Sequence, residues 1–172
     1  MKSVLISIQP KWCELIASGK KTVEVRKSRP KLDVPFKVYI YCTHNGTTRK
    51  EKDRNIYTDF SGKVIGEFVC DVIYETEPIE ETQTVIRHYP RPWWYNGADD
   101  CLHHTELEDY LRWKVGYGWH ISNLVIYDKP RELGEFRSYN VRAFMDDNGY
   151  PMPTHKITRP FQSWGYVYEI DT

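Results

Sequence analysis

Short runs of apolar residues, many of them alternating with polar ones, dominate the chain and predict strands more often than helices. The segments predicted as strands are 3–8, 22–27, 37–43, 63–74, 120–127 and 166–170. Helical spacing predicts helices at 10–18 and 106–113 and a single helical turn at 131–136. This pattern predicts a mainly β fold with a few helices (α+β), a compact and mostly antiparallel barrel whose last strand pairs with its first.

The first predicted helix leads directly into a charged strand. Pro10 suits the first helical position, where a missing N–H costs nothing, and Gly19 is typical of a left-handed helix end. In the strand that follows, two valines share one face, while Glu24 and Arg26 share the other. Lys21 lies at the mouth of this strand, so the three charged groups are expected close together.

Lys21, Glu24 and Arg26 form the candidate site. A partly desolvated lysine beside a carboxylate can hold an anion or act as a base, depending on how far its pKa is moved. A guanidinium offers a planar fork that fits a phosphate, a carbonyl group or a base edge. The alternative interpretation is an exposed strand whose Glu–Arg pair contributes little to stability.

Length and charge narrow the class of protein. The 172 residues (20.5 kDa) suit one domain over 1–172. Lys plus Arg and Asp plus Glu both number 24, so the formal net charge is zero. This balance argues against a polybasic protein that binds mainly by neutralising many phosphates, but it leaves room for a local basic groove. We expect no membrane partner and a cytoplasmic protein, because no apolar run approaches about 18 residues and the start does not fit a signal peptide.

The cysteines and histidines give little sign of a metal centre. Cys13, Cys42, Cys70 and Cys101 are far apart without a CxxC pair, which predicts buried free thiols. The segment 99–104 gathers aspartate, cysteine and histidine, but zinc sites usually need a second ligand pair, and none is evident. We therefore expect no metal and no cofactor.

The run Gly19-x-Lys21-x-x-Glu24-x-Arg26, after a short helix headed by Pro10 and Trp12, resembles the ASCH domain of the PUA-like superfamily. Two further segments carry the resemblance. Residues 118–133, from Gly-Trp-His-Ile to Arg-Glu-Leu, are similar to a stretch of bacterial and phage-encoded ASCH proteins, and 158–164 is the third match. The resemblance covers about 1–45, 62–74, 114–136 and 158–171. The segments 75–113 and 137–157 are interpreted as insertions.

The resemblance implies a PUA-like β-barrel with a helix beside an open cleft that binds RNA or a nucleotide-like ligand. Lys21 would supply positive charge, Glu24 would accept hydrogen bonds from an exocyclic amine, and Arg26 would bind an anionic or carbonyl group. Trp12 and Trp119 are candidate stacking or cleft-wall residues, with a purely core role as the alternative.

A hydrolase is the first alternative function. Some ASCH proteins are amidohydrolases that remove an acyl group from a modified cytidine, and others are ribonucleases. The amidohydrolase type uses a lysine matching Lys21, a threonine nucleophile and a later glutamate, for which Glu106 and Glu108 are loose candidates. Here Glu24 occupies the threonine position. A carboxylate cannot form the same covalent intermediate, but with Lys21 it can activate water as a catalytic pair.

A protein-interaction module is the second alternative. Residues 87–95 interleave arginines with aromatic rings, a composition that suits stacked bases, a protein partner, or a proline-rich loop folded onto the barrel. A second basic cluster flanks the candidate site and is either a binding surface or a solvated face; it comprises Lys20, Lys21, Arg26, Lys27, Arg29 and Lys31.

Overall fold

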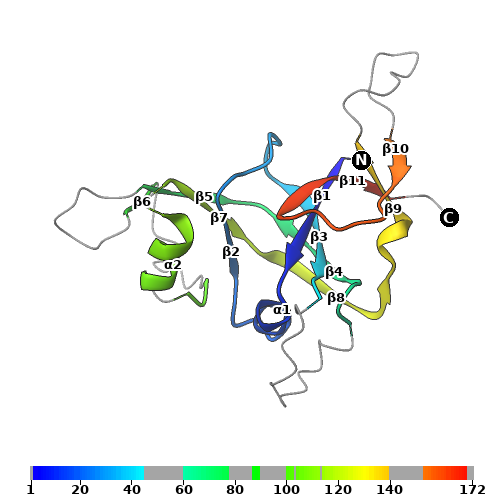
Figure 1. Cartoon of the computed structure of the whole chain (residues 1–172). Coiled ribbons are helices and arrows are strands. Elements are labelled where there is room, and N and C mark those ends of the chain that lie inside the picture. Colours follow the sequence, from blue (N-terminus) through cyan, green and yellow to red (C-terminus); the bar gives the residue numbers. More distant parts are fainter. Residues whose placement is uncertain are drawn as a thin grey trace. The chain divides into compact units, whose positions relative to one another are not determined.

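The computed structural model describes residues 2–44, 60–77, 87–89, 100–102, 104–112, 114–139 and 153–169. Over these residues the chain is mainly β, with few helices, as the sequence pattern predicts (Figure 1). The strands are β1 (Ser3–Ile8), β2 (Val23–Arg26), β3 (Phe36–Cys42), β4 (Val64–Cys70), β5 (Ile73–Glu77), β6 (Arg87–Tyr89), β7 (Gly116–His120), β8 (Ser122–Arg131), β9 (Phe136–Tyr139), β10 (Pro153–Lys156) and β11 (Trp164–Glu169). The helices are α1 (Pro10–Ala17) and α2 (His104–Leu111), with a 3₁₀ turn at Leu133–Glu135.

The chain divides into two compact units, each built from separate stretches of sequence. The first unit contains 1–14, 37–68 and 125–172, and the second contains 15–36 and 69–124. A seven-stranded sheet in the order β10-β9-β11-β1-β3-β4-β8 lies mainly in the first unit. A four-stranded sheet in the order β2-β7-β5-β6 belongs to the second.

The predicted pairing of the last strand with the first is confirmed. β11 runs antiparallel to β1, with Ser3 opposite Val167, and β1 also pairs in parallel with β3. The predicted closed barrel is not confirmed, because both sheets are open among the described strands. β10 and β8 are the edges of the larger sheet, and β2 and β6 are the edges of the smaller one. Alternation in a sequence predicts which segments become strands, but closure also depends on the stagger between strands.

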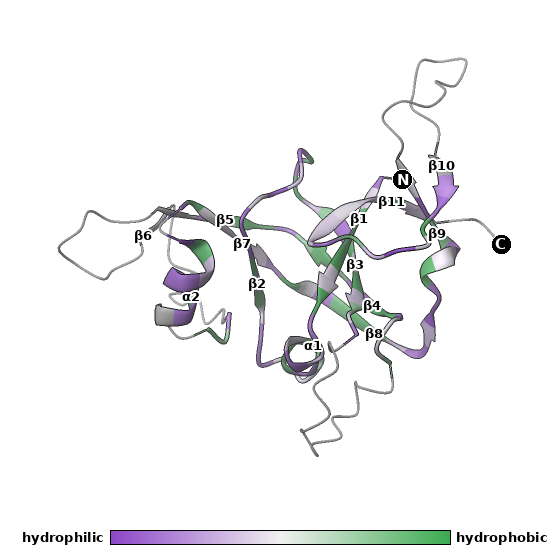
Figure 2. Cartoon of the chain, viewed as in Figure 1, coloured by the Kyte–Doolittle hydropathy of each residue, from purple (hydrophilic) through white to green (hydrophobic). Residues whose placement is uncertain are grey.

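The core of the first unit lies on its sheet. Leu5 and Val167 pack with Tyr39 and Phe136, whose ring centroids are 4.8 Å apart. Figure 2 shows hydrophobic residues along much of β4, whose Val64 joins the same cluster. Removing this apolar surface from water is the main stabilising contribution of the unit.

In the second unit, α2 covers one face of the small sheet. Val23, Val25 and Tyr74 pack against Leu107 and Leu111, while hydrophilic residues occupy much of the rest of α2 (Figure 2). The valine face of β2 is therefore the core face of this unit. Since successive strand residues point to opposite faces, Glu24 and Arg26 lie on the other side of the sheet.

Several element boundaries differ from the prediction. The segment 63–74 is not one strand, because Asp71 and Val72 leave the ladder and the chain passes from the large sheet to the small one. The segment 120–127 is likewise divided between β7 and β8. β9 was not predicted, since Phe-Arg-Ser-Tyr shows no apolar alternation.

The predicted free thiols are confirmed. All four cysteines are unpaired by disulfides, and Cys13, Cys42 and Cys70 are buried, while Cys101 is half-buried. Burial raises the pKa of the Cys70 thiol to about 12. Among the described residues, the helices are too short to cross a membrane.

Candidate functional site

The site begins where the chain turns after α1. Gly19 adopts φ +73°, a left-handed conformation that residues with a side chain rarely take. The backbone N–H groups of Lys20 and Lys21 both donate to the Leu15 carbonyl at 2.9 Å, which closes the helix end. Thr22 then accepts a 2.8 Å hydrogen bond from the Ile121 N–H. These contacts fix the backbone of Lys21 just before β2.

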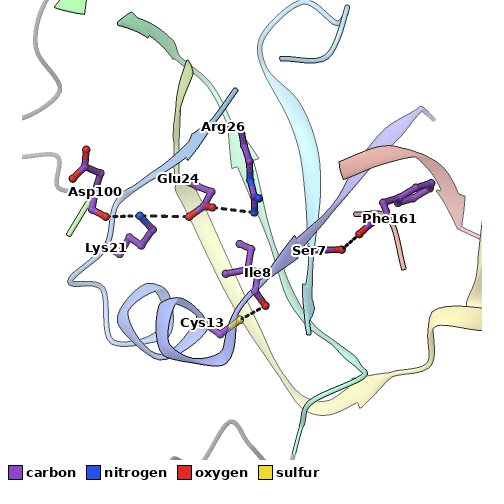
Figure 3. A network of polar contacts seen from close by, with 8 residues as sticks. All are labelled: Ser7, Ile8, Cys13, Lys21, Glu24, Arg26, Asp100 and Phe161. Atoms are coloured by element: carbon purple, nitrogen blue, oxygen red, sulfur yellow. Dashed lines mark hydrogen bonds and ion pairs between the residues drawn. The ribbon is translucent and has the colours of Figure 1, made fainter. Parts of the chain in front are cut away.

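Glu24 lies between two cationic side chains, as Figure 3 shows. Its Oε1 is 3.0 Å from Nη2 of Arg26, and its Oε2 is 3.4 Å from Nζ of Lys21. The predicted convergence of these three groups is present in the structure. We call Lys21, Glu24 and Arg26 the charged cluster.

Asp100 completes the surroundings of the lysine. Its backbone carbonyl accepts a hydrogen bond from Nζ of Lys21, although 79 positions separate the two residues in the chain. The Asp100 carboxylate points away from the lysine (Figure 3) and accepts a 2.9 Å bond from the Leu102 N–H. The sequence suggests Asp100 only as a possible metal ligand within 99–104. Nothing in its local sequence indicates a contact with Lys21.

The charged cluster is shielded from water. The side chains of Lys21, Glu24 and Arg26 are 2%, 7% and 11% exposed. Electrostatic interactions at such depth are stronger than on the surface, and an unpaired charge there costs several kcal/mol. The interpretation of these residues as an exposed strand with a weak ion pair is therefore wrong.

One carboxylate oxygen of the charged cluster retains hydrogen-bonding capacity. Among the residues that the structure describes, Oε2 of Glu24 is buried without accepting a hydrogen bond, and it faces Lys21 only at ion-pair distance. An ionised carboxylate can accept several hydrogen bonds. The oxygen is therefore chemically suited to receive a donor from a bound molecule.

Two aromatic residues of β7 lie beside the charged cluster on the same sheet face. Across the antiparallel β2–β7 pair, Glu24 is opposite Trp119 and Arg26 is opposite Tyr117. Side chains of directly opposed residues share a face and lie close together. Tyr117, which is not among the residues predicted for the site, thus belongs to the surroundings of Arg26.

The two candidate tryptophans have different environments. Trp119 is fully buried and meets the edge of Phe36, with ring centroids 5.9 Å apart and planes at 83°. Trp12 is half-buried in α1, where Nζ of Lys11 is 4.2 Å from the centre of its ring. Trp119 is therefore packed in the core, opposite Glu24 in the β2–β7 pair. The cleft-wall role of Trp119 and the ligand-binding role of Trp12 stay predictions.

Other candidates from the sequence are placed elsewhere or lie outside the described residues. Glu106 is exposed and Glu108 half-buried on α2. Side chains of 87–89 and all of 90–95 lie outside the description, so the protein-interaction interpretation stays a prediction. His103 is also outside it. Within the described part of the chain, no three His, Cys, Asp or Glu side chains gather in a way that could hold a metal ion.

An Asp–His pair marks the point where the chain changes sheets. Oδ1 of Asp71 is 2.7 Å from Nδ1 of His120. Burial alone would raise the pKa of Asp71. The hydrogen bonds that its carboxylate accepts from His120, Ser122 and the backbone, together with the electrostatic attraction of His120, outweigh burial and hold that pKa below its ordinary value of 3.8. Because the folded pKa is depressed, the pair stabilises the fold above the ordinary pKa and loses this effect as the pH falls through the folded value.

Asp71→Asn is therefore expected to make the free energy of unfolding depend less on pH in the acid range. Asp71 is 42% exposed, so we expect a loss of less than about 1 kcal/mol at pH 6. Thermal melts at pH 6 and pH 3 measure the effect, with Asp109→Asn on the exposed side of α2 as the control. An equal acid sensitivity of both variants would contradict this assignment.

Comparison with known proteins identifies the family. The ASCH domain model matches residues 6–131, well over half of the chain and including the charged cluster. A comparison with curated protein sequences finds no match.

Solved structures agree with this family match at the level of the fold. The crystal structure of ASCH from Zymomonas mobilis is similar with a TM-score of 0.52 and 22% identity, over 76% of this chain and 73% of that one. A single-substitution variant of the same protein is similar with a TM-score of 0.56 and 20% identity, over 96% of this chain and 88% of that one. The fold is therefore of the ASCH/PUA-like type, and the chain belongs to the ASCH domain family.

Proposed function

We propose that the charged cluster recognises the base of an RNA or of a modified nucleoside. The observation that carries this proposal is the buried Glu24 carboxylate, held between an ammonium and a guanidinium, with Oε2 able to accept a further hydrogen bond. Membership of a PUA-like family often linked to RNA binding supports the same conclusion.

The chemistry of the three groups fits a base that carries both an exocyclic amine and a carbonyl. A glutamate carboxylate accepts from the amine of cytosine, and a guanidinium donates to a ring carbonyl or nitrogen. Lys21 lies beside Oε2 of the Glu24 carboxylate. Uracil has a carbonyl in place of that amine, so it would place an acceptor against the carboxylate. The charged cluster should therefore prefer cytosine-type bases to uracil.

Calorimetric titration with cytidine and uridine tests the proposal. We expect cytidine to bind about tenfold more tightly than uridine, since an unpaired buried acceptor or an acceptor–acceptor contact costs about 1–3 kcal/mol. Glu24→Gln should remove most of this preference, with circular dichroism to verify that the variant is folded. Glu14→Gln, an exposed glutamate of α1, is the control. Equal binding of both nucleosides by the unsubstituted protein would overturn the proposal.

A hydrolase remains the second candidate, supported by the 3.4 Å separation of Oε2 of Glu24 and Nζ of Lys21. In this arrangement the carboxylate would take a proton from water, and the water oxygen would attack the acyl carbonyl carbon. The C–N bond to the exocyclic amine would then break, and the leaving amine would take that proton from Glu24, which releases a carboxylic acid and cytidine. Turnover of an N-acylated cytidine and of labelled RNA by the unsubstituted protein and by Lys21→Ala tests it. A rate that falls at least a hundredfold in Lys21→Ala would support hydrolysis. Equal background rates would exclude it.

A further inference from the structure

We infer that the segment after β2 forms a phosphate-binding site, which makes an oligonucleotide rather than a free nucleoside the ligand. Residues 27–33 and Tyr117 line an open depression of about 560 Å³. This volume lies within the range of ordinary small-ligand sites. The inference rests on the proposed function for the identity of the base, but the site itself is argued from its own charge and position.

The depression is strongly cationic for its size. Lys27, Arg29 and Lys31 are all exposed, and Asp33 is the one acidic residue in the segment. The protein as a whole carries no net charge, so this excess is a local feature. Groups of exposed lysine and arginine side chains bind phosphates by charge and, for arginine, by paired hydrogen bonds.

Within the segment 27–33, some residues are shielded from water while the cationic side chains face solvent. Pro30, between Arg29 and Lys31, is buried, and Leu32 is half-buried. Pro30 and Leu32 are thus shielded from water, while the neighbouring cations face solvent. Such a segment presents its charges without the ordering cost of a fully mobile loop.

The contacts that two of these cations make within the protein are weak enough to be exchanged for phosphate. Nη1 of Arg29 is 3.9 Å from Oε1 of Glu75, and both side chains are about half exposed. Nζ of Lys27 is 4.8 Å from the ring centre of Tyr110 on α2. Ion pairs and cation–π contacts at exposed sites contribute little, so a phosphate with stronger charge-assisted bonds can replace them.

Tyr117 connects this depression to the charged cluster. It is half-buried, lines the depression, and lies opposite Arg26 in the β2–β7 pair and opposite Glu75 in the β5–β7 pair. The cluster and the depression thus share one face of the small sheet. A strand whose base reached Glu24 would place neighbouring phosphates along 27–31. The half-buried ring of Tyr117 beside the proposed base-reading groups favours a nucleic acid over an acidic peptide, because bases stack on aromatic rings.

The test compares a ten-nucleotide cytidine RNA with free cytidine on the full chain. The double variant Arg29→Gln/Lys31→Gln should weaken RNA binding about tenfold at 50 mM salt. It should also reduce the slope of log K against log salt by about 1.4, the value for two phosphate contacts on a single strand. Cytidine binding should not change. Lys129→Gln/Lys156→Gln removes the same charge from exposed positions of the first unit and should leave the slope nearly unchanged.

The outcomes separate this inference from the proposed function. Equal slopes for the two double variants would overturn the phosphate site, even if cytidine still binds through Glu24. RNA binding that depends on Arg29 and Lys31 but shows no preference for cytidine would support the site and refute the base-reading role. Equally strong, equally Arg29-dependent binding of a polyglutamate peptide would overturn the nucleic-acid assignment. Absence of any RNA binding would overturn the phosphate site, and absence of both RNA and cytidine binding would overturn the proposed function as well.

Discussion

Glu24→Gln is expected to lower the free energy of unfolding by about 3–5 kcal/mol. The substitution keeps the shape of the side chain but removes the negative charge that lies between Arg26 and Lys21, all of them 11% exposed or less. Two cations would then remain buried without their shared counter-ion. Urea denaturation followed by circular dichroism at pH 7 measures the loss.

Two further variants test whether charge is the cause. The double variant Glu24→Gln/Arg26→Gln should be more stable than Glu24→Gln alone, because it also removes one of the two buried cations that face the lost carboxylate. Glu75→Gln is the matched control, since Glu75 is 47% exposed and faces Arg29 at 3.9 Å. It should cost less than about 1 kcal/mol. A similar loss in free energy of unfolding for Glu24→Gln and Glu75→Gln would show that the charge of Glu24 contributes no more than that of an exposed ion pair.

The convergence of the three charged groups was predictable because its cause is local. A helix that stops at Gly19 and a strand with alternating faces lie within eight residues of one another, and the structure has both where the sequence indicates them. Local geometry alone therefore places Glu24 and Arg26 on one face of β2, with Lys21 just before it.

The parts that were not predicted depend on contacts between distant segments. The Asp100 carbonyl reaches Lys21 across 79 positions, and Tyr117 reaches the face of Arg26 only through the register of β2 with β7. A single sequence carries no register information until the partner strand is known. The same limit explains why strand positions were predicted but the open edges of both sheets were not.

The burial of Trp119 favours a cleft-wall or core role over a stacking role. A stacking platform needs an exposed ring face, whereas Trp119 is fully buried and already contacts Phe36 edge-on. Its position opposite Glu24 instead suits a residue that excludes water from the charged cluster. The low dielectric that strengthens the contacts of Glu24 would then depend on this side chain.

Trp119→Ala should therefore destabilise the protein by about 3–5 kcal/mol, the usual cost of removing a large buried aromatic side chain. Trp119→Phe should cost clearly less, because it retains most of the apolar contact with Phe36, and it should keep the preference for cytidine over uridine. Trp12→Ala, which removes a half-buried ring from α1, is the matched control. Its loss in free energy of unfolding should be smaller than that of Trp119→Ala. Urea denaturation and nucleoside titration of the three variants measure both effects. If Trp119→Phe kept its stability but lost all cytidine binding, the ring of Trp119 would contact the base directly, and its assignment as a wall residue would be wrong.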